Sequence, residues 1–198
     1  MERKSARRNK SPQKPESPLN APQNFARDFL VQAQHSLVEH HLPRIIACLE
    51  KLSDEDVWWR PNAASNSAGN LALHLAGNVR QWIVSGLGGE PDIRNRDQEF
   101  QEQGPIPKRV LVALLQKTVK SACRTLGKLS SVDLRSDYTI QKFHVTGFEA
   151  VTHITEHFAY HTGQIIYVTK LRSGEDLNFT RLPGDIRRKP KRPRLSAV

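Results

Sequence analysis

The chain has 198 residues, of which 30 are Lys or Arg, 20 are Asp or Glu and 8 are His, and its formal net charge is +10. This length suits one domain with short extensions, and no run of about 18 apolar residues predicts a membrane span. The basic first 22 residues lack the apolar segment of a secretory signal. Two cysteines are too few for a disulfide framework, so we expect a cytoplasmic protein.

The positive charge is concentrated at the two ends of the chain. Residues 1–22 carry six basic and two acidic side chains, and residues 181–198 carry seven basic and one acidic. The stretch between them has 17 of each and is neutral, whereas a domain that reads nucleic acid carries positive charge on its folded surface. Only non-specific phosphate contacts through the ends are expected. Their composition predicts disordered basic tails at 1–23 and 181–198, around a domain at 24–180.

Apolar residues recur at helical spacing from Asn24 to Leu52 and predict the first long helix. Pro43 lies inside this stretch, and because proline lacks an amide hydrogen we expect a kink or a break near His41. A second helix is predicted to begin near Ser67, a good N-capping residue, and to end at the glycines from Gly86 onward.

The stretch 92–107 is long and polar, and such a loop is either a functional lid or a disordered segment. The third predicted helix opens at Pro107. Residues 130–146 lack a helical period and include a short extended segment. The fourth helix is expected over 147–173, because Gly174 is a typical helix-ending residue. Four long amphipathic helices in one neutral domain predict an all-α four-helix bundle.

Histidines are concentrated in the fourth predicted helix. His153, His157 and His161 follow one another at intervals of four, so each step turns only about 40° and all three share one face. Two histidines at this spacing can hold one metal ion, although a histidine satisfied within the core is the simpler alternative. A third ligand must come from another helix. His74 is the best candidate, because an unpaired imidazole between two leucines would be costly to bury.

The segments NLALHLAGNVRQW and HITEHFAYHTGQI resemble the DinB/YfiT-like superfamily of small bacterial helical metalloproteins. The resemblance covers most of residues 24–180, and the loop GLGGEPDIRNRDQEF is similar to an uncharacterised DinB-like subgroup. It implies a metal held by one His of the second helix and two of an HxxxHxGQ motif, which here are His74, His157 and His161. His153 is not usually a ligand in that superfamily. The resemblance also raises the expectation of a homodimer.

Three neutral imidazoles leave at least one metal position open, which is the pattern of a catalytic site. Zinc or nickel suits imidazole best, and iron or manganese can also bind it. Cys48 and Cys123 have no paired spacing and are interpreted as core residues.

The superfamily includes thiol-dependent S-transferases and isomerases. The resemblance therefore implies a metal-dependent transferase or hydrolase acting on a small molecule, with a low-molecular-weight thiol as a candidate partner. The alternative is a non-enzymatic, metal-binding stress-response bundle whose basic tails contact nucleic acid or acidic partners.

Four residues near the predicted site have two interpretations each, and a fifth, Trp82, has one. Gln164 and Asn78 lie one turn from predicted ligands, and they either orient water or a ligand's free ring nitrogen or simply tie helices together. Trp82 is interpreted as a packing residue rather than a site residue. Arg94 and Arg96 either bind an anionic substrate over the metal or have no specific role.

Overall fold

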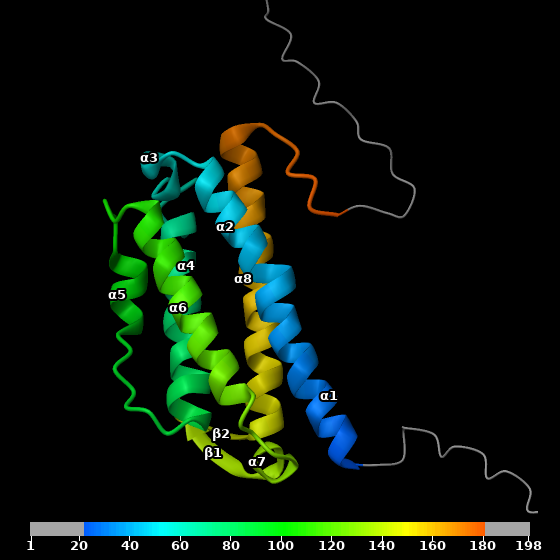
Figure 1. Ribbon diagram of the computed structural model, residues 1–198. Helices are drawn as coiled ribbons and strands as arrows, with labels where there is room; N and C mark the ends of the chain where they lie inside the picture. Colours follow the sequence, from blue (N-terminus) through cyan, green and yellow to red (C-terminus); the bar gives the residue numbers. More distant parts are fainter. Residues whose placement is uncertain (1–21, 181–198) are drawn as a thin grey trace, which may run out of the picture.

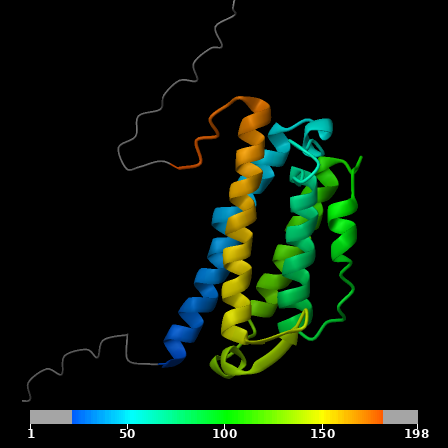
Figure 2. The ribbon, with the colours of Figure 1, turned by 180° about the vertical axis from the view of Figure 1, so that it is seen from behind.

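The computed structural model describes residues 22–180, in which four long helical segments lie side by side (Figure 1). These segments comprise residues 22–51, 68–87, 108–126 and 147–173. Seen from behind, the last of them runs the full height of the molecule (Figure 2). The predicted all-α four-helix bundle is therefore confirmed for the part of the chain that the structure describes. The predicted tails, 1–23 and 181–198, lie outside it apart from residues 22 and 23.

The first long segment consists of α1 (Pro22–His35), the π-helical η2 (Ser36–His41) and α2 (Leu42–Lys51). The break expected near His41 does not occur, because the helix widens ahead of Pro43 instead. The amide of Leu42 donates to the carbonyl of Leu37, five residues back. A proline ring clashes with the carbonyl four residues before it, and the wider turn relieves that clash while the helix continues.

The second long segment follows the short α3 (Asp54–Val57) and consists of α4 (Ala68–Val79) and the π-helical η3 (Arg80–Leu87). It begins as predicted at Ser67, whose hydroxyl accepts the amide hydrogen of Asn70 in a capping box. It ends at Gly88, and the following Gly89 has φ +75°. This left-handed conformation is one that glycine adopts without strain.

The polar stretch 92–107 is ordered, because it contains α5 (Arg96–Gln101), which packs against α4. Asn95 caps α5 by accepting the amide hydrogen of Gln98. A helix of six residues has too few turns to show an apolar period in the sequence. The segment is held by contacts to the bundle rather than by its own helical propensity.

The second half of the chain contains α6 (Lys108–Leu126), α7 (Ser131–Arg135), β1 (Asp137–Ile140), β2 (Phe143–Thr146) and α8 (Gly147–Ser173). The strands form an antiparallel hairpin that pairs Tyr138 with Val145, which confirms the extended segment expected within 130–146. Thr146 and Glu149 form a capping box at the start of α8, and Gly174 ends the helix with φ +66°.

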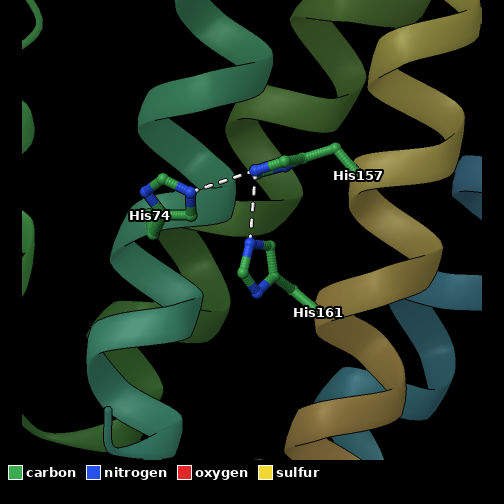
Figure 3. Close-up of side chains that lie close together, drawn as sticks. All are labelled: His74, His157 and His161. Atoms are coloured by element: carbon green, nitrogen blue, oxygen red, sulfur yellow. Dashed lines mark hydrogen bonds between the residues drawn. The ribbon is translucent and has the colours of Figure 1, made fainter. Parts of the chain in front are cut away.

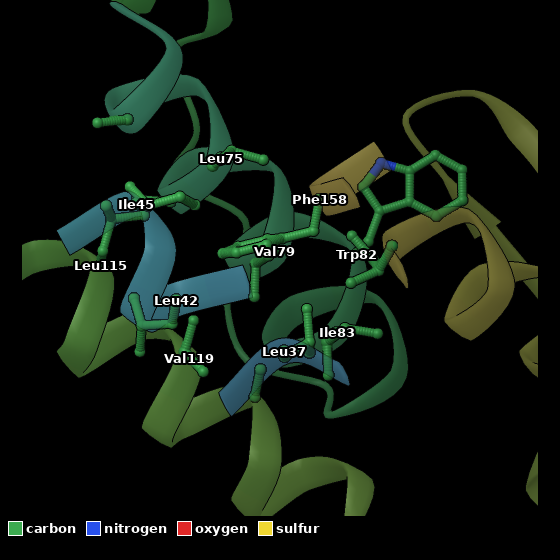
Figure 4. Packing of buried hydrophobic residues seen from close by; sticks show 14 of the residues in the cluster. Leu37, Leu42, Ile45, Leu75, Val79, Trp82, Ile83, Leu115, Val119 and Phe158 are labelled. Carbon is green, nitrogen blue, oxygen red and sulfur yellow. The ribbon is translucent and has the colours of Figure 1, made fainter. Parts of the chain in front are cut away.

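The core lies between the four long segments and is built mainly from leucine, isoleucine, valine and alanine (Figure 4). Cys48 is fully buried in it and Cys123 packs against it, which confirms the core interpretation of both. Among helices of residues 22–180, none combines the length and the apolar character needed to span a bilayer.

Candidate metal centre

The three predicted ligands meet between α4 and α8 (Figure 3). His74 comes from the middle of α4, and His157 and His161 come from successive turns of α8. Nε2 of His157 lies 3.1 Å from Nε2 of His74 and 3.2 Å from Nε2 of His161. The ligand atoms of all three residues lie within 4.8 Å of one another. The structure thus brings together residues that are 83 positions apart in sequence.

The three ring nitrogens that face one another cannot all be hydrogen-bonded at the same time. A neutral imidazole nitrogen either carries one hydrogen or presents one lone pair, so Nε2 of His157 can pair with only one of its two neighbours at a time. Two nitrogens bound to one tetrahedral zinc at about 2.0–2.1 Å lie roughly 3.3 Å apart. The two observed separations are close to this value, so the residues present are compatible with a divalent metal.

Glu99 of α5 holds the outer nitrogen of His74. Nδ1 of His74 lies 2.9 Å from Oε2 of Glu99. Arg94 supports the carboxylate with two hydrogen bonds, from Nε to Oε1 at 2.7 Å and from Nη2 to Oε2 at 2.8 Å. Nη2 of Arg94, which can only donate, also lies 3.0 Å from Nδ1 of His74. The contact with Glu99 requires a hydrogen on Nδ1, because the carboxylate can only accept, and Nε2 of His74 then presents its lone pair to the cluster.

The Arg94–Glu99 pair is almost fully buried, with side-chain exposures of 3% and 10%. Burial alone would raise the pKa of Glu99, but the hydrogen bonds from Arg94 and His74 outweigh it and hold the pKa below its usual value. Glu99 is therefore a carboxylate at neutral pH. Arg94 also donates to Oε1 of Gln81 at 2.9 Å, so its guanidinium is committed to the protein itself.

Gln164 fixes the second ring, because its Oε1 lies 2.6 Å from Nδ1 of His161. The sequence leaves two roles open for Gln164, and this contact favours the one in which Gln164 orients the ring of a predicted ligand. The amide oxygen accepts from Nδ1 and leaves the lone pair of Nε2 for the cluster. Nδ1 of His157, by contrast, is buried without a hydrogen-bond partner.

Burial sets the charge state of the two α8 rings. It lowers the pKa of His157 to about 3, and the neighbouring His161 and His74 act in the same direction. Burial also lowers the pKa of His161, although the hydrogen bond with Gln164 works against it. Both rings are consequently neutral at pH 7, which is the state in which imidazole binds a metal.

The fourth histidine of this region lies beside the cluster and not in it. The ring of His153 lies on the indole of Trp82, with centroids 4.0 Å apart, and its centroid is 5.3 Å from that of His157. The described part of the chain contains one group of three metal-ligand side chains, and neither His153 nor the histidines near Pro43 belong to it.

Comparison with known proteins identifies the family and the fold of the chain. The profile of the family described as "Protein of unknown function (DUF1572)" matches residues 24–185. The chain belongs to this family. No curated protein matches the sequence.

Two solved structures show that the DUF1572 chain has a DinB-like fold. A DinB-like protein from Bacillus cereus ATCC 10987 is 16% identical, with a TM-score of 0.54 over 73% of this chain and 91% of that one. A DinB-like protein (YjoA) from Bacillus subtilis is 20% identical, with a TM-score of 0.55 over 77% of this chain and 96% of that one. The fold expected from the DinB/YfiT-like resemblance is thereby confirmed.

The sequence does not single out Glu99, and neither interpretation of Arg94, an anion-binding residue or one without a specific role, predicts its pairing with Glu99 in this DUF1572 chain. One available signal was general: a metal-bound histidine usually donates its other ring nitrogen to a carboxylate or carbonyl. The sequence gives no rule for choosing Glu99 among its many acidic residues. Its proximity to His74 depends on how α5 docks on α4.

Proposed function

We propose that His74, His157 and His161 bind one divalent metal ion through their Nε2 atoms, with zinc or nickel preferred. The convergence of three imidazoles, two of them held by Glu99 and Gln164, supports this assignment. Three protein ligands leave at least one coordination position for another molecule. Iron or manganese also remains compatible with the donor set.

We further propose that the protein is a metal-dependent enzyme, a transferase or hydrolase acting on a small molecule. A cavity of about 270 Å³ borders His74 and His157 and supports this proposal, because it gives a small molecule access to the open position. A divalent cation held there acts as a Lewis acid and lowers the pKa of a bound group. A low-molecular-weight thiol is the first candidate for that group.

The residues of the chain have separate tasks in this proposal. Glu99 keeps the hydrogen of His74 on Nδ1, and Gln164 does the same for His161. The buried Arg94 keeps Glu99 ionised and in place. Together they set the orientation of two ligand rings before any substrate arrives.

The test begins with elemental analysis of purified full-length protein and of the His157→Ala variant. The wild type is expected to carry one zinc or nickel per chain, and the variant substantially less; undiminished metal in the variant contradicts the ligand assignment. Transfer activity is then measured with cysteine and an alkylating electrophile, and hydrolysis with 4-nitrophenyl acetate. Activity that disappears on chelation and returns with metal supports the enzyme. A non-enzymatic metal-binding bundle is the alternative, and the tails it invokes lie outside residues 22–180.

A further inference from the structure

The cavity beside the proposed metal centre lies between two rows of side chains that run in opposite directions. His74, Asn78 and Trp82 follow each other at intervals of four along α4 and η3. His157 and His153 face them from α8, with ring centroids 4.9 Å apart for His74–His157 and 4.0 Å for Trp82–His153. The cavity therefore extends from the histidine cluster toward Trp82.

Polar atoms without partners are concentrated on the walls of this cavity. Six buried side-chain polar atoms of residues 22–180 lack a hydrogen-bond partner, and four of them belong to residues that line it. These four are Asn78 Oδ1, Trp82 Nε1, His153 Nε2 and His157 Nδ1. Asn78 and Trp82 are only 3% and 4% exposed. Burying an unpaired polar group is costly. These atoms are covered by protein in the free structure, so a bound molecule reaches them only after the covering side chains shift.

The charged residues that line the cavity indicate the charge of a molecule that would bind there. Two arginines and no acidic residue line the cavity. Arg94 is neutralised by Glu99, whereas Arg96 forms none of the ion pairs found within residues 22–180. The Arg96 guanidinium instead lies 4.9 Å above the ring of Phe100. One uncompensated cation and donors such as Trp82 Nε1 favour an anion.

The remaining wall is aromatic and flat. Phe143 of β2 lies across from Trp82, with ring centroids 6.2 Å apart and an angle of 31° between the planes. Phe143 is 59% exposed, an unusual state for a phenylalanine beside a buried tryptophan. The exposed ring of Phe143 therefore offers most of the contact area for a flat apolar group, and the 4% exposed Trp82 adds a small part of it.

We propose that this cavity binds a small organic anion with a flat apolar body, which Trp82 and Phe143 contact and whose charged group Arg96 attracts. Among the unpaired atoms of the lining residues, Nε1 of Trp82 is a donor for such an anion, whereas Oδ1 of Asn78 can only accept. The proposal rests on the proposed function in one respect: the end of the ligand nearest His157 faces the metal. It narrows the substrate class of that site to organic acids.

The test measures binding of phenylacetate, and of its neutral analogue phenylacetamide, to zinc-loaded full-length protein by calorimetry. Zinc content is determined on the same samples. We expect saturable binding of one phenylacetate per chain and affinity for the amide lower by at least about fivefold. Because an exposed ion pair contributes up to about 1 kcal/mol, Arg96→Gln should weaken phenylacetate binding by about fivefold. Arg109→Gln, an equally exposed position outside the cavity, should leave it unchanged.

The outcomes separate this proposal from the metal assignment. Zinc-loaded protein that binds no phenylacetate, or binds it equally well in Arg96→Gln, overturns the anion site: water alone then fills the cavity or zinc alone holds the carboxylate. A chain that takes up no zinc but still binds phenylacetate through Arg96 removes the metal proposal and supports the anion site.

Discussion

Gly77 and Glu99 fit together only because Gly77 has no side chain. A Cβ atom built at Gly77 would lie 1.9 Å from Oε1 of Glu99 and 3.0 Å from Nε of Arg94. The carboxylate that holds His74 is thus placed directly against the backbone of α4. The packing of α5 on α4 and the orientation of His74, a proposed metal ligand, both depend on the absence of a side chain at Gly77.

Gly77→Ala is therefore expected to reduce metal affinity by about 10–100-fold, the usual effect of losing the partner of a metal-bound histidine. The added methyl group displaces the Glu99 carboxylate from His74. Gly163→Ala is the matched control, because a Cβ there meets nothing within 4 Å. Competition with a chromophoric chelator measures both affinities; equal values for the two variants contradict the role given to Glu99.

His157→Ala should lose the metal and His153→Ala should retain it. His157 contributes Nε2 to the cluster, whereas the ring of His153 lies against Trp82. Elemental analysis of the two purified variants, side by side, checks the expectation. If His153→Ala is the variant without metal, His153 is a ligand and the proposed ligand set is wrong.

Glu99→Leu should destabilise the fold by about 3–5 kcal/mol, because it leaves the buried guanidinium of Arg94 without its partner. The double variant Arg94→Leu/Glu99→Leu removes both charges and should recover most of that loss. Urea unfolding of the metal-free proteins gives the two free energies. A double variant less stable than Glu99→Leu would show that Arg94 is stabilised mainly by Gln81.

Acid should destabilise the metal-free protein through His157. Its pKa is about 3 in the folded state against 6.5 in the unfolded chain, so the unfolded chain takes up the proton first. The stability that the neutral ring contributes is complete above pH 6.5 and is lost as the pH falls toward 3.

The predicted slope is up to about 1.4 kcal/mol per pH unit for this one group. His157→Gln has no such titration and should show a shallower fall in unfolding free energy between pH 6 and about 4. Parallel curves for the two proteins would assign the acid sensitivity to other groups.

The long helices are predictable from the sequence, because the extent of their apolar period agrees with the positions of the capping and terminating residues. The capping serine at Ser67 and the terminating Gly174 mark helix ends that the structure reproduces. The spacing of His157 and His161 likewise places both on one face, since helical geometry alone fixes it.

What the sequence could not supply depends on contacts between distant segments. The pairing of Glu99 with His74 follows from the docking of a six-residue helix that has no apolar period. The closeness of Trp82 to His153 follows from the antiparallel packing of two helices, and so Trp82 was interpreted only as a packing residue. Pro43 predicts that the first long helix is disturbed at this point, but the sequence does not predict that the disturbance takes the form of a widened π-helical turn.

The 83-residue separation between His74 and His157 has a thermodynamic consequence. A cation bound to both would cross-link α4 and α8, much as a disulfide closes a long loop. Global unfolding of the protein would then have to release the cation. The free energy of unfolding would then increase with the logarithm of the ratio of free metal concentration to dissociation constant, and the melting temperature would rise with it. In a cell, the amount of folded protein would follow the supply of that metal.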